Sequence, residues 1–212
     1  MRHSIRLETE ADYREVEEVT REAFWNLYVP GCDEHYLAHI MRDHSDFIPE
    51  LDFVAVADDK IVGNIMYTKS RIVDKSNNEI EAITFGPISV LPNFQKRGYG
   101  SALIQHSKKV AQAEGHRVII IEGHPHNYCK HGFKGSKTYN ISDAEGKFPF
   151  ALLVLEIEDG LLSGNNWKYF PSEVYNIDGQ VAEEFDKLFP DKKKEYNYTQ
   201  EEFLIASQAY IN

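Results

Sequence analysis

One stretch of the sequence decides the fold: Ile83–Ser101, which reads ITFGPISVLPNFQKRGYGS. It begins as a β-forming run, passes through a turn that contains Gly98 and Gly100, and continues into a segment with helical periodicity. The first amides of a helix carry a partial positive charge, and glycines let a ligand approach the backbone. Lys96 and Arg97 add two full positive charges. The turn is therefore predicted to bind an anion such as a pyrophosphate.

The pair Gly86-Pro87 interrupts the strand that precedes this turn. Proline has no N–H for a strand ladder, and glycine inside a strand often marks a bulge or a close approach of backbone. We therefore expect the strand to bend or splay here. The backbone groups of Ile88, Ser89 and Val90 would then be partly unpaired and could bind an extended ligand that carries amides. An edge bulge without a ligand is the alternative.

The segments before this stretch predict two helices and three antiparallel strands. Thr9 and Asp12 are placed to cap a helix that runs to about Trp25, and Asp33 can cap a second, short helix that ends at Met41. Runs of β-branched and aromatic residues between polar turns place the strands at 51–57, 61–68 and 79–90.

After the turn, a helix at 98–114 and a strand at 117–122 complete a strand–helix–strand unit, which implies parallel pairing of the two strands. Two more strands, the second returning beside the first, and two more helices are expected at 148–157, 168–177, 180–189 and 199–211. The predicted fold class is α/β (α+β), with a mixed central sheet of antiparallel N-terminal strands and two splayed parallel strands, flanking helices and a C-terminal helical extension. We divide the chain into a domain at 1–160 and an extension at 161–212 packed on the same domain.

Composition and charge exclude several classes of protein. The 212 residues include 34 acidic and 23 basic side chains, and the net charge of −11 would repel a nucleic-acid backbone. The sequence has neither a long apolar run nor a signal peptide, which predicts a cytoplasmic protein without a membrane partner. Cys32 and Cys129 are far apart and are expected to be free thiols. The C-terminal helices could form a homodimer.

The turn and its surroundings resemble the GNAT superfamily of N-acetyltransferases. The cofactor motif of that family, Q/R-x-x-G-x-G/A, is matched by Gln95–Gly100, while Gly86–Val90 and Gly123–Phe133 resemble a strand and a loop of a bacterial branch. The resemblance implies that acetyl-CoA binds between two parted parallel strands. The implied cofactor contacts are Ile88, Ser89, Val90, Gln95, Lys96, Arg97, Gly98, Tyr99, Gly100, Ser101 and Asn127. Two residues of the loop depart from the branch: Asn127 replaces a tyrosine and His131 a phenylalanine.

Acyl transfer from a thioester to an amine needs a base for the amine, donors for the oxyanion and a proton for the thiolate. Tyr128 is the predicted acid or hydrogen-bond donor, with packing against the cofactor as the alternative. Glu81, which shares a strand face with Glu79, and Glu122 at the end of the facing strand are the candidate bases. Ordinary solvated carboxylates are the alternative. The resemblance implies the amide of Val90 as the oxyanion donor.

The acceptor is predicted to be a small-molecule amine or a peptide amine. Trp25, Tyr28 and His35 are the candidate substrate-binding residues, because they lie in or beside the loop between the first two helices, together with Cys32. Core packing of these residues is the alternative.

A metal site is not predicted. The residues of the later loop that suit zinc lack the spacing of a standard ligand set: His124, His126, Cys129 and His131. The resemblance instead implies acetyl transfer from acetyl-CoA to a primary amine by direct attack in a ternary complex. The alternatives are a non-catalytic acyl-CoA-binding or regulatory module, and an acyltransferase of the same fold for longer chains.

Overall fold

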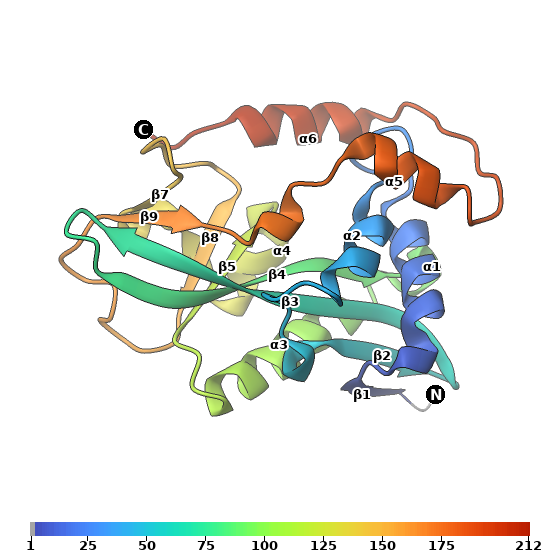
Figure 1. Cartoon of the computed structure of the whole chain (residues 1–212), viewed down its shortest axis with the longest axis horizontal. Coiled ribbons are helices and arrows are strands. Elements are labelled where there is room, and N and C mark those ends of the chain that lie inside the picture. The colour runs from blue at the N-terminus through green and yellow to red at the C-terminus, as the bar shows by residue number, and fades with distance from the viewer. Residues whose placement is uncertain (1–2) are drawn as a thin grey trace.

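The computed structural model describes residues 3–212 and is built around a mixed sheet (Figure 1). Its strands are β1 (His3–Leu7), β2 (Phe53–Ala57), β3 (Lys60–Asp74), β4 (Glu79–Val90), β5 (Val118–Glu122), β6 (Lys134–Gly135), β7 (Ile141–Ser142), β8 (Leu152–Glu156) and β9 (Trp167–Phe170). The main path of the sheet runs β1-β2-β3-β4-β5-β8-β6, and β9 pairs with both β3 and β7.

The helices are α1 (Tyr13–Phe24), α2 (Glu34–Met41), α3 (Tyr99–Ala113), α4 (Pro125–Tyr128), α5 (Gly179–Asp186) and α6 (Tyr198–Gln208). Short 3-10 turns lie at Glu10–Asp12, Pro49–Leu51, Pro92–Phe94, Cys129–His131, Ser136–Tyr139 and Glu173–Tyr175. The predicted pair Thr9 and Asp12 meets at the start of α1, where the Thr9 amide and hydroxyl both donate to the Asp12 carboxylate. Asp33 precedes α2 as predicted, but its side chain makes no capping hydrogen bond.

The two faces of the sheet are covered by different helices. On β2, Phe53 and Ala55 belong to the core that includes Leu103 of α3, whereas Val54 packs with Val16 of α1. Successive residues of a strand point to opposite faces, so α1 and α3 lie on opposite sides of the sheet. Figure 1 shows α2 beside α1 on its side of the molecule.

The mixed sheet predicted from the sequence is confirmed, but some strands differ in length, and β1, β6 and β7 were not predicted. β3 extends to Asp74 instead of 68, because Lys69–Val73 continue to pair with β4 and the last residues also pair with β9. The strand β1 was not predicted from its largely polar sequence. It is an edge strand in which Ile5 pairs with Ala55 and packs against the core.

The predicted strand at 168–177 is wrong in its extent and its neighbour. The observed β9 ends at Phe170, because Pro171 has no N–H for a ladder and Ser172 caps the following 3-10 turn by accepting a hydrogen bond from the Val174 amide (3.4 Å). It pairs antiparallel with β3 and parallel with β7, whereas β8 pairs antiparallel with β5.

The C-terminal segment lies against both ends of the molecule. Figure 1 shows α6 running across the top, from the region of α5 and α1 towards the C terminus beside β7. The Asn26 carbonyl accepts hydrogen bonds from Asn197 and Gln200 (both 3.0 Å), and the Ile211 amide donates to the Phe148 carbonyl (2.8 Å). The predicted helices of the extension are present, while its boundary at residue 160 stays a prediction.

Candidate active site

The parallel strands β4 and β5 part shortly after they meet. Their ladder contains the pairs Ile83 with Ile119 and Thr84 with Ile120. On its other side β4 pairs with β3, where Ile88 is opposite Ile65 and Phe85 is opposite Tyr67. Between these two pairs β4 has two residues and β3 has one, so β4 carries one extra residue at the cis peptide Gly86-Pro87. The bend and splay predicted for this pair are confirmed.

The parted edge of β4 presents specific backbone groups. The Leu91 amide donates to the Val62 carbonyl (2.9 Å), which makes these two residues a hydrogen-bonded pair in the antiparallel ladder with β3. Hydrogen-bonded and non-hydrogen-bonded pairs alternate along such a ladder. The N–H and C=O of Val90 and of Ile88 therefore point away from β3, towards the side where β5 has separated.

Ser89 does not face this side. By the same alternation its backbone is paired with Asn64 of β3. Its side chain is 1% exposed and donates to the Thr20 hydroxyl of α1 (3.2 Å). Of the three predicted contacts on this strand, Ile88 and Val90 line the cavity and Ser89 holds α1 against the sheet.

The turn before α3 has the geometry expected of an anion site. Gly98 is the N-cap residue with φ +93°, a conformation that favours glycine. The first helical hydrogen bond is donated by the Ala102 amide to the Gly98 carbonyl (2.9 Å), so the amides of Gly100 and Ser101 precede it. Within residues 3–212, no side chain caps this helix. The exposed N-terminus of α3 can therefore accept an anionic ligand.

One cavity of about 900 Å³ joins the turn to the parted strands. Of the predicted cofactor contacts, it is lined by Ile88, Val90, Gln95, Lys96, Gly98, Tyr99, Gly100, Ser101 and Asn127. In the described part of the chain, Arg97 does not line this cavity. Its guanidinium lies 5.4 Å from the centroid of the Phe94 ring. Gln95 also closes the turn, because its side-chain amide donates to the Val90 carbonyl (3.1 Å).

Tyr128 lies in this cavity at the end of the loop that follows β5. It is 9% exposed and packs edge-on against Phe85 and Phe133, with ring centroids 5.7 and 6.2 Å apart. Burial raises the pKa of its phenol above the ordinary value. The hydroxyl is therefore protonated at neutral pH, as a hydrogen-bond donor requires.

Two further tyrosines close the cavity from the C-terminal segment. The Tyr169 hydroxyl lies 2.8 Å from the hydroxyl of Thr84, which is the last residue of β4 that pairs with β5. The Tyr175 hydroxyl donates to the Gly86 carbonyl (3.3 Å), where the strands part. Sequence reasoning missed both, because nothing in their local sequence indicates that β9 returns beside β3.

Two carboxylates line the cavity, and one of them was not predicted. Glu122 ends β5, and the surrounding protein raises its pKa by restricting hydration, with a further contribution from the charge of Asp143. Glu34 is the first residue of α2, and burial raises its pKa to about 7. Its position directly after the N-cap Asp33 was the available signal, since the sequence already placed this helix start beside the candidate acceptor loop.

Glu81 is not brought into the cavity. Its side chain is 65% exposed and lies 3.9 Å from His116, on the part of β4 that precedes the paired residues. A base must reach the substrate directly or through one water. Among the predicted bases, the structure therefore places Glu122 in the candidate site and leaves Glu81 outside it.

Trp25 and His35 lie outside the large cavity, unlike Tyr28, which lines it. Trp25 lines a second cavity of about 760 Å³ between the loop after α1 and helix α5. Its indole donates to the Lys193 carbonyl (2.9 Å), and the Arg21 guanidinium covers its ring at 4.3 Å. His35 is 0% exposed. Both residues serve packing beneath the C-terminal segment.

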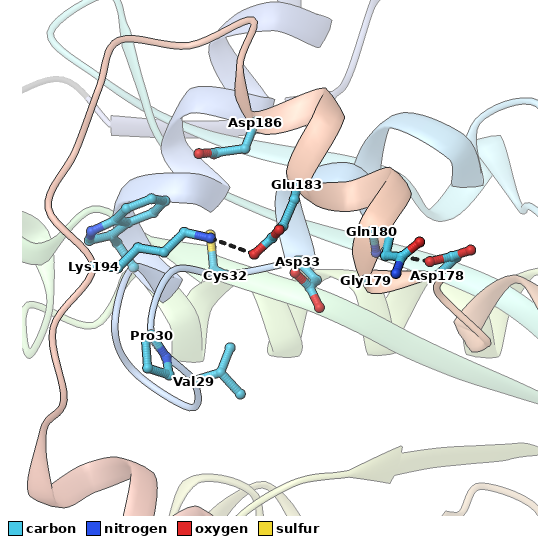
Figure 2. Close-up of a pocket in the computed structure, with 11 residues that line it drawn as sticks. Val29, Pro30, Cys32, Asp33, Asp178, Gly179, Gln180, Glu183, Asp186 and Lys194 are labelled. Atoms are coloured by element: carbon cyan, nitrogen blue, oxygen red, sulfur yellow. Dashed lines mark hydrogen bonds and ion pairs between the residues drawn. The ribbon is translucent and has the colours of Figure 1, made fainter.

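Cys32 and Asp186 line the second cavity (Figure 2), and the buried His35 lies between them. Cys32 Sγ lies 3.5 Å from His35 Nδ1, and His35 Nε2 lies 3.0 Å from an oxygen of Asp186, which also accepts from Arg21 (2.6 Å). Burial raises the pKa of the Cys32 thiol and lowers that of His35 to about 4. The reactive form of cysteine is the thiolate, which the burial of Cys32 disfavours.

The remaining predictions concern cysteines, metals and membranes. Cys32 and Cys129 are free thiols, as predicted. In the described part of the chain, no three His, Cys, Asp or Glu side chains come together as a possible metal site. Nor does any helix within residues 3–212 have the length and apolar character needed to cross a membrane.

The chain matches a family model and a curated relative. The model, Acetyltransferase (GNAT) family, matches residues 18–133. The uncharacterized N-acetyltransferase YjhQ of Escherichia coli (strain K12) is 28% identical over 106 residues, which are 49% of this chain and 58% of that relative. The matched region thus spans less than two thirds of the relative's length.

Solved structures show the same fold. The GNAT family N-acetyltransferase YhbS from Escherichia coli, in complex with CoA, has a TM-score of 0.72 at 18% identity, over 84% of this chain and 93% of that one. A GNAT family acetyltransferase from Brucella melitensis, in complex with acetyl-CoA, has a TM-score of 0.64 at 21% identity, over 82% and 98%. Because the family model matches more than half of the residues, and includes the parted strands and the turn before α3, this chain belongs to the GNAT acetyltransferase family.

Proposed function

We propose that this protein is an acetyl-CoA-dependent N-acetyltransferase that moves the acetyl group to a primary amine by direct attack. One observation carries the proposal: the parted ends of β4 and β5, the turn before α3 and the ring of Tyr128 line a single cavity. Family membership supports it, as do the CoA and acetyl-CoA complexes of two structures with the same fold.

The residues of the cavity fit a phosphorylated carrier with an extended amide-bearing arm. The amides of Gly100 and Ser101 at the start of α3, with the nearby Lys96, offer hydrogen bonds and positive charge to a pyrophosphate. The outward N–H and C=O groups of Ile88 are suited to pair with the amides of the pantetheine arm, as an added strand would.

Acetyl-CoA would supply the acetyl group as a thioester. In the proposed reaction the amine nitrogen attacks the thioester carbon, the new C–N bond forms, and the C–S bond breaks. Glu122 takes the proton that the amine loses, and the Tyr128 hydroxyl donates to the departing sulfur. In this reaction the outward amide of Val90 stabilises the oxyanion.

A CoA thiol-release assay with a panel of amines tests this function. We expect amine-dependent release of CoA from acetyl-CoA, and faster release than from succinyl-CoA or longer acyl-CoAs. Tight CoA binding without release for any amine would contradict the proposal and favour a non-catalytic acyl-CoA-binding module. Preference for a longer acyl group would retain the transferase reaction but contradict acetyl-CoA as the donor.

A further inference from the structure

The two ends of the large cavity carry opposite charges. Lys96, in the turn before α3, and Lys130, in the loop after β5, both line the cavity. This loop reaches the start of α3, where the His131 ring lies 3.4 Å from the Ser101 hydroxyl. Glu34 and Glu122 line the part formed by α2, the end of β5 and the C-terminal tyrosines. The cavity therefore offers cations to a phosphorylated donor at one end and carboxylates to a second ligand at the other.

Neither carboxylate has a cationic partner in the protein. Within residues 3–212, no lysine, arginine or histidine nitrogen lies within 4.0 Å of a carboxylate oxygen of Glu34 or Glu122. Glu34 accepts a hydrogen bond from the Asp33 amide (3.2 Å). By contrast, the buried Glu8 pairs with Arg42 at 2.8 Å. Glu34 is half-buried and Glu122 is exposed at the end of β5, so both carboxylates can be reached by a ligand cation, which would compensate the partial desolvation of Glu34.

Glu122 is the carboxylate at the end of β5, where this strand has parted from β4. It directly precedes Gly123, whose backbone lies under the ring of Tyr128. Its charge also acts on Tyr169 and Tyr175, the two tyrosines that stand where β4 and β5 part. An amine beside Glu122 would therefore lie between the parted strands, near the hydroxyl proposed to protonate sulfur.

Glu34 lies on a different wall. It begins α2, and its charge acts on Tyr28, which follows α1 and also lines the cavity. Tyr28 is held in place by stacking on Phe203 of α6, with ring centroids 4.6 Å apart. The Glu34 carboxylate is thus fixed by α2 and a packed aromatic ring, whereas Glu122 is fixed by the sheet.

The surface around the two carboxylates is apolar and aromatic. Its lining residues from the first two helices and their connecting loop are Ala23, Phe24, Leu27, Tyr28 and Leu37. Such walls favour a chain of methylene groups by removing it from water. They offer no charge to a second anionic or neutral polar group of the acceptor.

Building on the acetyltransferase function above, we propose that the acceptor is a diamine or another amine with a second cationic group. Glu34 is the specificity-determining residue that binds the second ammonium group, while Glu122 faces the amine that becomes acetylated. The apolar wall formed by the first two helices contacts the spacer between the two nitrogens. The net charge of −11 would also draw a dication towards the protein.

The test compares 1,5-diaminopentane with pentylamine as acceptors at saturating acetyl-CoA. The parent protein is expected to acetylate the diamine with a kcat/KM at least about tenfold higher, the effect of one charge-assisted hydrogen bond. Glu34→Gln should remove this preference by raising KM for the diamine by a larger factor than KM for pentylamine. Glu34→Asp should restore part of it. Glu50→Gln, an exposed carboxylate outside the cavity, is the matched control and should keep the preference.

Each outcome decides the proposal. Equal kcat/KM for the two amines in the parent protein overturns the second-cation inference and leaves the acetyltransferase function intact, even if Glu34→Gln does not fold. A Glu34→Gln variant that loses the same factor with both amines also overturns it, because the residue then acts on the reaction or the fold instead of the second ammonium. Absence of acetylation with every amine overturns the proposed function and this inference together.

Discussion

The ring of Tyr128 lies so close to the backbone of Gly123 that a methyl group on the glycine Cα would come within 2.6 Å of Tyr128 Cε2. Glycine at this position lets the loop after β5 fold back over the strand end. The tyrosine therefore reaches the cavity that Glu122 also lines. This contact fixes the position of the group proposed to act as the acid.

Gly123→Ala is expected to displace Tyr128 and to lower kcat at least tenfold, since a displacement of about 1 Å can reduce a rate by two orders of magnitude. It should also lower the free energy of unfolding by about 1–3 kcal/mol. Thiol-release kinetics and urea unfolding measure the two effects. Gly179→Ala is the control, because a Cβ there meets nothing within 4 Å. A Gly123→Ala protein with the parent kcat would contradict the positioning role.

Tyr128→Phe separates the hydroxyl from the ring. The ring contacts with Phe85 and Phe133 can persist, so the variant should fold and keep its affinity for acetyl-CoA within about threefold. Loss of a general acid typically reduces the rate by about 10²–10⁴-fold. We expect kcat to fall by at least the lower of these factors, as measured by thiol release. Unchanged turnover would show that Tyr128 serves packing alone.

Glu34 makes stability depend on pH in a defined direction. Its pKa rises from 4.5 to about 7 on folding, so the folded state holds the proton more tightly and the parent loses stability as pH rises from about 4.5 through 7. Glu34→Gln lacks this loss. Its free energy of unfolding relative to the parent should therefore be higher at pH 8 than at pH 4.5, by at most about 3 kcal/mol. A difference independent of pH, measured by urea unfolding with Glu50→Gln as control, would contradict the raised pKa.

Arg42 ties the start of the chain to the first two helices. Its side chain is 5% exposed and lies 2.8 Å from Glu8 and 3.1 Å from Glu17, whose side chains are 1% and 7% exposed. Arg42→Met should cost about 3–5 kcal/mol, because it leaves the buried carboxylate of Glu8 without its cationic partner and Glu17 with only His39 and Arg14. Arg71→Met, which removes an arginine 55% exposed, should cost less than about 1 kcal/mol. Equal losses in thermal or urea unfolding would contradict this role of burial.

The donor half of the site was predictable from the sequence because its determinants are local. The strand, the Gly86-Pro87 interruption, the turn and the following helix are contiguous, and each has a composition with a direct backbone consequence. The bend appears where the sequence predicted it, and α3 begins at Tyr99, one residue after the predicted start. Ser89 was predicted to offer its backbone to the ligand like Ile88 and Val90. Successive residues of a strand point their backbone groups in opposite directions, so the Ser89 backbone faces β3 instead.

The acceptor half was predicted less well because its residues come from separate parts of the chain. Tyr169 and Tyr175 reach the cavity only because β9 pairs with β3, a contact between residues about a hundred positions apart. His35 resembles a site residue in sequence, yet its neighbours on α5 bury it completely. Glu34 is the converse case: it lines the cavity although it was not predicted as a site residue, because the packing that raises its pKa comes from tertiary structure.

Isothermal titration of the folded protein with CoA tests the central claim that the parted strands and the turn before α3 receive this carrier. Gly98→Ala and Gly164→Ala form a matched pair, because both glycines have positive φ (+93° and +80°) and a Cβ would meet nothing within 4 Å at either. The parent and Gly164→Ala should each bind one CoA with similar affinity, and Gly98→Ala should bind at least about tenfold more weakly, since an alanine there strains the turn by roughly 1–2 kcal/mol. Failure of the folded parent protein to bind CoA, or equal affinity in both variants, would contradict the account.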